Sequence, residues 1–329
     1  MSINPKKIKN ILILRNDRFG EFLLNIPALA ALKETFPGAN IIAVVSPYTK
    51  ELAQNIAFID EVMEWSQQKH PLIEKLRLIG TLKKKRIDMA IMLNPSKEFN
   101  ILTFLSGIPV RVGYDRKWGF LLTHKIEDKK FLGLKHEIEY NLELVALIGA
   151  KTENQALSLK TDYDSVSGLL KEYNITVEDN LIAVHPFTSD PLKQWPINNF
   201  VELTKRLVRD GIKIIIVGGR EDLENSTRLF NDLQNLGVIN LTGRTTLKQL
   251  AALLKVCRLL ISGDSGPVHL ASCVGTQVLA IFRSDMPEKS SRRWGPLTQG
   301  SVVIEKPNLT DITLDEVFNK INLAGESLR

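Results

Sequence analysis

ILILRNDRFGEFLLNIPALAALKETF, residues 11–36, is the stretch that decides the fold. Its first part, Ile11–Arg15, is an unbroken apolar run that ends in a charged residue. Such a run is typical of a strand buried on both faces of a parallel sheet. Gly20 permits a tight turn, and Glu21–Phe36 then predicts a helix. A strand, a glycine turn and a helix are the repeating unit of a doubly wound α/β sheet.

The same alternation runs through most of the 329 residues. Strands are expected at 11–15, 41–45, 61–65, 87–93, 181–185, 213–217, 238–241, 258–262 and 277–282. Helices are expected at 21–36, 49–56, 71–85, 136–148, 197–210, 221–236, 247–255, 266–274 and 313–323. The pattern restarts after a mixed polar stretch at 149–180. We therefore expect two Rossmann-like doubly wound parallel-sheet domains, 1–175 and 176–312, facing a central cleft at the strands' carboxyl ends.

Composition narrows the class of protein. No apolar run reaches the roughly 20 residues of a spanning helix, and the four apolar residues after the N-terminus are too few for a signal peptide. We therefore expect a cytoplasmic protein. Two cysteines exclude a disulfide scaffold.

Charge is unevenly distributed along the chain. Residues 1–175 hold 25 Lys+Arg against 20 Asp+Glu, and residues 176–329 hold 18 against 17. This excess suggests that the first half meets an anionic partner, such as a phosphorylated substrate or a membrane surface, although a plain basic surface explains it as well. The chain lacks zinc-finger, RNP and basic-zipper patterns, so no nucleic-acid partner is expected.

A first candidate site follows the first strand. Glu21 starts a helix at the expected mouth of the cleft, beside Arg15, Asp17 and Arg18. A carboxylate in that place could act as a general base. An acid in the first helical turn, favoured by the helix dipole, explains Glu21 equally simply. No dinucleotide fingerprint or Walker A sequence occurs.

A second candidate site combines two loops of the second half. Thr188, Ser189 and Lys193 follow the strand LIAVH and could bind a phosphate, or could merely form a turn. In GDSGPVHLA, residues 263–271, the free N–H groups at a helix start suit an anion. Candidate contacts in this segment are Asp264, Ser265, Gly266 and His269. His269 could instead be a core histidine.

Two acidic features complete the candidates. Glu221 or Asp222, after the strand KIIIV and two glycines, could hold a ribose hydroxyl, although an ordinary helix cap is an equal explanation. Asp162–Tyr163–Asp164 is a D-x-D pair like those of metal-dependent sugar transferases, but it lies in the interdomain stretch, where chance is the simpler reading. No clustered His/Cys set exists, so no metal site is expected.

Together these segments resemble glycosyltransferase family 9, the ADP-heptose:lipopolysaccharide heptosyltransferases. The resemblance runs from Ile11 to about Pro296. It rests on RNDRFGEFLLNIPA (15–28), KQWP (193–196), LTGRTTL (241–247) and DSGPVHLA (264–271), in that order. It implies a GT-B architecture whose N-terminal domain receives an anionic glycolipid acceptor and whose C-terminal domain binds ADP-heptose. It also implies that the last helix, within 313–329, packs back on the N-terminal domain.

The resemblance also implies roles for single residues. Glu21 is in the position of the family's base and would take the proton of the acceptor hydroxyl, with inversion at the anomeric carbon and no metal or other cofactor. Thr188, Ser189 and Lys193 would hold the diphosphate, assisted by Ser265 and Gly266. Asp264 would bind sugar hydroxyls, His269 the phosphate or sugar, and Glu221 or Asp222 the ribose. An acceptor on a membrane lipid would favour peripheral contact with the cytoplasmic leaflet.

Three departures from the family pattern bear on the donor and the base. Glu21 replaces the usual Asp and is one methylene longer, Phe187 replaces a common Gly after His-Pro, and Arg283 replaces a Gly after the strand ending at Phe282. Other nucleotide sugars therefore remain open as donors. Two other kinds of protein also fit the pattern: a sugar-nucleotide epimerase or hydrolase using the same cleft, and a non-catalytic sugar-nucleotide-binding protein.

Overall fold

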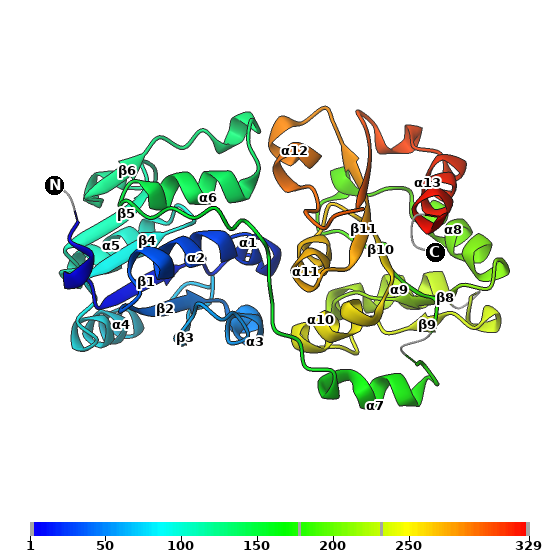
Figure 1. The fold of residues 1–329 in the computed structure, drawn as a ribbon, viewed down its shortest axis with the longest axis horizontal. Coiled ribbons are helices and arrows are strands. Elements are labelled where there is room, and N and C mark those ends of the chain that lie inside the picture. The colour runs from blue at the N-terminus through cyan, green and yellow to red at the C-terminus, as the bar shows by residue number, and fades with distance from the viewer. Residues whose placement is uncertain (1–2, 177–178, 231–232, 327–329) are drawn as a thin grey trace. The chain divides into compact units, whose positions relative to one another are not determined.

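The computed structural model describes residues 3–176, 179–230 and 233–326. The chain divides into two compact units, Met1–Leu159 and Lys160–Arg329. Each unit contains one six-stranded sheet in which every pair of neighbouring strands is parallel, with helices packed around it (Figure 1). The prediction of two doubly wound α/β domains is confirmed.

The first sheet has the strand order β3-β2-β1-β4-β5-β6. Its strands are β1 (Asn10–Leu14), β2 (Asn40–Val45), β3 (Glu61–Glu64), β4 (Met89–Met92), β5 (Val110–Tyr114) and β6 (His124–Ile126). The register pairs Ile11 with Ile41 on one side and with Met89 on the other. All three side chains are fully buried, as expected of central parallel strands covered on both faces. The strand order reverses between β1 and β4, which is where open α/β sheets bind ligands.

The helices of this unit are α1 (Phe19–Leu23), α2 (Ile26–Thr35), α3 (Lys50–Ala53), α4 (Leu72–Lys84), α5 (Lys97–Leu105) and α6 (Glu137–Ala146). The single helix expected at 21–36 is therefore two helices. Pro27 lies in the first turn of α2, where a missing N–H is tolerated. The Asn25 side chain donates to the carbonyls of Glu21 and Phe22, both at 2.9 Å, and so satisfies groups that the break releases.

The second sheet has the order β12-β11-β10-β7-β8-β9, which is the topology of the first sheet read from its other edge. Its strands are β7 (Leu181–His185), β8 (Lys213–Ile216), β9 (Ile239–Asn240), β10 (Leu259–Gly263), β11 (Gln277–Arg283) and β12 (Val302–Lys306). The strand order reverses between β7 and β10, which pair from Leu259↔Ile182 to Ser262↔His185. The second ligand position expected of the fold therefore lies at the ends of these two strands.

The helices of the second unit are α7 (Asp164–Glu172), α8 (Ile197–Arg209), α9 (Leu223–Phe230), α10 (Leu247–Val256), α11 (Gly266–Val274), α12 (Ser291–Trp294) and α13 (Leu314–Glu326). Short 3-10 helices are η1 (Pro5–Lys7), η2 (Pro47–Thr49), η3 (Gly119–Leu121), η4 (Lys130–Leu132), η5 (Pro191–Lys193), η6 (Arg220–Asp222), η7 (Gln234–Leu236), η8 (Pro287–Lys289) and η9 (Leu309–Asp311).

The expected boundary between the two domains differs from the structure. The boundary placed at 175/176 lies at 159/160, because α7 belongs to the second unit. Gln249 of α10 donates to the Ser165 carbonyl at 3.1 Å, which ties α7 to the second unit. The expectation that the last helix packs back on the N-terminal domain stays a prediction, and within its own unit α13 has a clear place. Val317 and Ile321 of α13 are buried in the second unit's core, and the Trp195 indole N–H donates to the Ile312 carbonyl just before α13.

Candidate active site

Arg15 organises the carboxyl end of β1. Its side chain is only 3% exposed, and each of its nitrogens has a partner. Nε donates to Asp17 Oδ1 and Nη2 to Glu21 Oε2, both at 2.8 Å, while Nη1 donates to the Leu93 carbonyl at 3.1 Å. Leu93 directly follows β4. Arg15 therefore spans the β1/β4 reversal and holds two carboxyl groups there. Arg15 and Asp17 lie beside Glu21, as expected from the sequence, and their expected contact with substrate stays a prediction.

Asp17 and Glu21 have different pKa values in the folded chain. Burial raises the pKa of Asp17 to about 7, the neighbouring Glu21 adds to this, and Arg15 opposes it. Burial acts to raise the pKa of Glu21 as well, but Arg15 and a hydrogen bond with Asp17 outweigh it, so the pKa of Glu21 is lowered. Glu21 is therefore the ionised member at neutral pH, and its side chain is the more exposed, 26% against 11%. An ionised, accessible carboxylate is what a general base requires.

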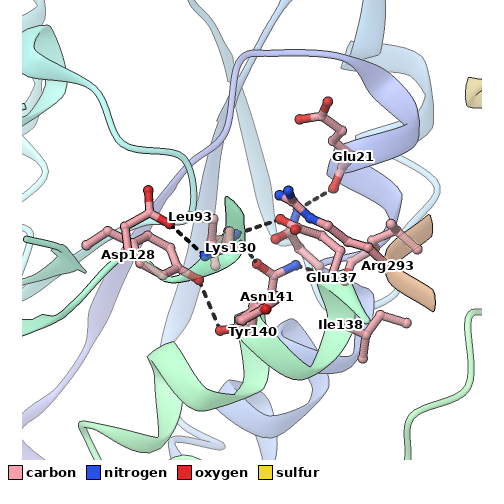
Figure 2. Close-up of polar contacts among 12 residues, drawn as sticks. Glu21, Leu93, Asp128, Lys130, Glu137, Ile138, Tyr140, Asn141 and Arg293 are labelled. Carbon is pink, nitrogen blue, oxygen red and sulfur yellow. Dashed lines mark hydrogen bonds and ion pairs between the residues drawn. The ribbon is translucent and has the colours of Figure 1, made fainter. Parts of the chain in front are cut away.

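Sequence reasoning missed a second layer behind Arg15. Glu137, the first residue of α6, is 1% exposed and lies 3.5 Å from Arg15 Nη1 through Oε1. The same oxygen accepts from Lys130 Nζ at 2.6 Å, and Lys130 also lies 3.5 Å from Asn141 Oδ1. Figure 2 shows Lys130, Glu137 and Asn141 pointing toward one another. The sequence signal that could have found Glu137 is its spacing from Asn141. The two polar residues are four positions apart, on the face of α6 that buries Leu144 and Val145.

The second unit brings Lys193 and Asp264 together at the β7/β10 reversal. Lys193 ends η5 after β7, and Asp264 follows β10 directly. Their side chains form an ion pair at 2.5 Å between Lys193 Nζ and Asp264 Oδ2, with exposures of 14% and 8%. The two residues expected to contact the diphosphate and the sugar therefore lie side by side at the place where the topology expects a ligand.

Ser265 and Gly266 form the start of α11, as predicted. Ser265 is the N-cap residue, yet its side chain makes no capping bond. Its hydroxyl instead shares hydrogen bonds with Ser262 Oγ at 2.8 Å and His185 Nδ1 at 3.2 Å. Burial lowers the pKa of His185 to about 4, so this histidine is neutral. The Ser265 hydroxyl therefore does not cap α11. Pro267 has no N–H and the Val268 N–H donates to the Ser265 carbonyl at 3.2 Å, so the donor at the first helical position is the Gly266 N–H, and a helix start suits an anion.

His269 has the surroundings of a core residue. It lies inside α11, is 4% exposed, and its ring faces that of Trp294 at 6.1 Å between centroids. Those surroundings match the alternative weighed for it, a core histidine. Its expected role toward a phosphate or sugar stays a prediction.

The loop that carries Lys193 is fixed from a neighbouring loop. Thr188 Oγ1 accepts from the Asp190 N–H at 3.2 Å, so Thr188 forms the turn that was one of its two equal alternatives, while Ser189 is exposed. Lys289 pairs with Asp190 at 2.7 Å. Arg283 Nη1 donates to the Leu192 carbonyl at 3.0 Å. Arg283 therefore helps to hold this loop.

The large side chain of Phe187 is accommodated because a glycine, Gly218, lies beside it. The side chain is 4% exposed, and a Cβ on Gly218 would come within 2.8 Å of its ring. Phe187 therefore fills space that Gly218, two residues after β8, leaves open. The residue departs from the family pattern but is accommodated inside the second core.

The candidate ribose contacts lie on η6. Asp222 Oδ2 accepts from the Gly219 N–H at 2.8 Å, which is the capping role weighed as the alternative, and burial raises the pKa of Asp222. Glu221 is exposed, with its carboxyl folded over Gly219 so closely that a Cβ there would clash. The expected contact of Glu221 or Asp222 with a ribose stays a prediction.

The D-x-D pair lies at the start of α7 and makes hydrogen bonds there. Asp162 accepts from the Asp164 N–H at 3.1 Å, next to the start of that helix, and pairs with Lys248 at 2.9 Å. Across residues 3–176, 179–230 and 233–326, no group of three or more His, Cys, Asp or Glu side chains is arranged to hold a metal ion.

Comparisons with known proteins agree with the family suggested by the motifs. The model of glycosyltransferase family 9 (heptosyltransferase) matches residues 75–317. A Haemophilus influenzae protein described as a glycosyltransferase is 26% identical over 96% of both chains. Lipopolysaccharide heptosyltransferase 2 of Salmonella typhimurium is 24% identical over 84% of both. The structure of E. coli ADP-heptose lipopolysaccharide heptosyltransferase II is similar with a TM-score of 0.84 and 22% identity, covering 98% of this chain and 99% of that one.

Proposed function

Because this chain belongs to glycosyltransferase family 9 and is therefore a glycosyltransferase, we propose that it transfers a heptose or related sugar from ADP-heptose to a lipopolysaccharide core or similar cell-surface glycolipid. The observation that carries the proposal is the carboxyl pair on Arg15 at the β1/β4 reversal. The named relatives supply the donor and acceptor classes, and the residues supply the chemistry.

Glu21 is the base in this proposal. Its ionised carboxylate takes the proton of the acceptor hydroxyl while that oxygen forms a bond to the anomeric carbon. The bond between the anomeric carbon and the diphosphate oxygen breaks on the opposite face, so the configuration inverts and ADP leaves with the electron pair. Asp17 carries a proton for much of the time at neutral pH, which spares Glu21 a second negative charge beside it.

Lys193 and the start of α11 are the proposed partners of the leaving ADP. A lysine and the positive end of a helix dipole both favour negative charge, which grows on the diphosphate during the reaction. Asp264 pairs with Lys193 in the structure. A bound donor would draw Lys193 toward its phosphates and release Asp264 for sugar hydroxyls. Thr188, Ser189, His269, Glu221 and Asp222 remain proposed donor contacts of lesser weight.

Metal independence is part of the proposal. The cation that offsets the leaving diphosphate would be Lys193, assisted by the helix start, so the chemical step needs no divalent ion. We expect transfer to continue with EDTA present. Loss of turnover in EDTA that Mg²⁺ or Mn²⁺ restores would refute this part.

The acceptor side is proposed to meet an anionic lipid surface. The structure contains no helix, among the residues it describes, that is long and apolar enough to cross a membrane. The Met1–Leu159 unit has 23 Lys+Arg against 17 Asp+Glu, and Lys160–Arg329 has 20 against 20. The protein's net charge of +6 therefore resides in the first unit, which the family resemblance assigns to the acceptor. The proposed location is the cytoplasmic face of the membrane.

One loop of that unit fits such a surface. Trp118 and Phe120 are 45% and 70% exposed, with ring centroids 5.7 Å apart. Lys97 Nζ lies 4.2 Å over the Trp118 ring, and Lys117 is exposed beside it. Lys117 and Trp118 both adopt positive φ, 48° and 72°, which costs non-glycine residues energy. Asn100 stabilises the turn by donating to the Lys117 carbonyl at 3.0 Å. Aromatic rings beside lysines are typical of groups that rest at a membrane interface.

The deciding experiment measures ADP release from ADP-heptose in EDTA, with and without a glycolipid extract of the source organism's envelope. We expect release only with the extract. ADP release without an acceptor would instead identify a hydrolase, conversion of the donor sugar without ADP release would identify an epimerase, and binding without any turnover would identify a sugar-nucleotide-binding protein. Tight binding of another nucleotide sugar, with ADP-heptose inert, would keep the enzyme class and overturn the donor.

A further inference from the structure

We propose that Glu137 is a positioning residue that acts on Glu21 through Arg15, and that Lys130 sets how strongly it does so. The inference deepens the proposed function, because it concerns the base of that same reaction. It rests on one guanidinium shared by three carboxyl groups from three different segments: Asp17 in the loop after β1, Glu21 in α1 and Glu137 in α6.

The geometry gives the three carboxyl groups unequal shares of Arg15. Asp17 and Glu21 each accept at 2.8 Å, whereas Glu137 stands off at 3.5 Å, the limit for a hydrogen bond. The same Glu137 oxygen binds Lys130 at the shorter distance of 2.6 Å, so its charge is shared between two cations. Glu137 thus interacts with Arg15 mainly through its charge, across a short buried distance where charges are weakly screened.

Lys130 is itself held in place. Its Nζ lies 4.5 Å over the Tyr114 ring and 3.5 Å from Asn141 Oδ1, and its backbone N–H donates to Asp128 Oδ1 at 3.2 Å. The Asn141 amide donates to the Leu24 carbonyl at 3.2 Å. Leu24 is the C-cap of α1, the helix that carries Glu21. Figure 2 shows this network from Asp128 through Lys130 to Asn141. The α6 network is therefore tied to the middle of α1, through Arg15 and Glu21, and to its C-terminal end, through Asn141 and Leu24.

The consequence for the base follows from the signs of the charges. Arg15 alone would stabilise the Glu21 carboxylate so strongly that it would be a poor proton acceptor. Glu137 offsets part of the Arg15 charge and raises the proton affinity of Glu21, and Lys130 in turn offsets part of Glu137. Arg15, Asp17 and Glu137 act on Glu21 directly, and Lys130 acts on it through Glu137.

The test reads Glu21 directly, without any substrate. Carboxyl ¹³C NMR titration of labelled protein gives the midpoint for Glu21, assigned by comparison with Glu21→Gln. Glu137→Gln keeps the shape and removes the charge, so the midpoint should fall by about 0.5–1 pH unit. Lys130→Gln should move it upward by a similar amount. Glu143→Gln is the matched control on α6, because Glu143 pairs with the exposed Lys135 instead, and it should leave the midpoint unchanged.

Opposite shifts for Glu137→Gln and Lys130→Gln support the proposal, since a merely structural role would not give opposite signs. An unmoved midpoint in either folded variant, or shifts of the same sign, would overturn it. If Glu137→Gln does not fold, Lys130→Gln decides alone. Glu137→Asp keeps the charge and should hold the midpoint within about 0.3 unit of the wild type.

A second measurement links the effect of Glu137 and Lys130 on Glu21 to turnover. The acidic limb of the pH profile of kcat should move with the NMR midpoint in each variant, while KM for ADP-heptose stays unchanged. A wild-type enzyme inactive at every pH would refute the proposed function, yet the NMR titration would still decide the role of Glu137. If the enzyme is active but the acidic limb of its kcat profile does not move with the NMR midpoint, the positioning role alone is refuted.

Discussion

Replacing Asp17 by Asn should remove a pH dependence of stability that the carboxyl pair creates. Burial raises the pKa of Asp17 from 3.8 to about 7 in the folded chain. A carboxyl with a raised pKa contributes stability that is fully present below its unfolded pKa and is lost as pH rises through the folded one. The wild type should therefore lose stability from about pH 4 to pH 7 and slightly above. Asp17→Asn, which imitates the protonated form, should not show this loss.

The magnitude follows from the size of the shift. Each unit of pKa is worth about 1.36 kcal/mol, so the full effect is on the order of 4 kcal/mol. About 2.6 kcal/mol of it falls between pH 5 and pH 8, because the unfolded carboxyl is already mostly ionised at pH 5. The lowered pKa of Glu21 acts at more acidic pH, so it does not blur this window.

The assay is urea unfolding at pH 5, 6, 7 and 8, monitored for the first unit, with Asp115→Asn as a control. Asp115 is an exposed acid of the same unit, paired with Lys125, and should not alter the wild-type pH dependence. Asp17→Asn should already be the more stable protein by about 1–2 kcal/mol at pH 5 and by about 4 kcal/mol at pH 8, so the difference should widen by about 2–3 kcal/mol across this range. Parallel curves for wild type and Asp17→Asn would refute the raised pKa and with it the proton that we assign to Asp17.

The other expectations concern the base, the donor loop, the second core and the lipid surface. Glu21→Ala should abolish transfer while leaving the calorimetric affinity for donor intact, and appreciable turnover would remove Glu21 as base. Lys193→Ala should weaken donor binding and turnover together, by about tenfold or more if the charge-assisted contact is worth about 1.5–3 kcal/mol; unchanged kinetics would exclude it from the diphosphate site. Gly218→Ala should lower the unfolding free energy of the second unit by about 1–3 kcal/mol, because its Cβ meets the Phe187 ring at 2.8 Å; a denaturation curve like that of the wild type would contradict the packing. Alanine at both Trp118 and Phe120 should reduce co-sedimentation with vesicles of anionic phospholipid, and wild-type binding to neutral vesicles alone would contradict the charge argument.

Much of the fold could be predicted because its central strands are unbroken apolar runs. Leu181–His185 and Gly266–Val274 match the structure to the residue. β12 was missed because it is an edge strand whose side chains are mostly part-exposed, so it carries little apolar signal. The break between α1 and α2 was missed because Pro27 is compatible with a helix, and the Asn25 side chain that supports the break acts through contacts a pattern does not show.

The candidate site could be predicted only as far as local motifs extend. Arg15, Asp17 and Glu21 lie within seven residues, so one motif contained them. Glu137 lies 122 residues from Arg15, and its partner Lys130 reads as one more surface lysine in a basic stretch. Only the folded chain shows that both are buried. The roles of Arg283 and Phe187 were unpredictable for the same reason, since each acts on a segment distant in sequence.

The separation between Arg15 and its α6 partners has a consequence for how the protein is made. During synthesis Arg15 leaves the ribosome well before β4, and Glu137 and Asn141 follow later still. Until then the nascent chain has a cation whose burial is not yet matched by its full set of partners, which disfavours early closure of the first sheet around it. Once about 160 residues have emerged, every partner of Arg15 named above is available. The first half can then complete its own folding while the second half is still being translated.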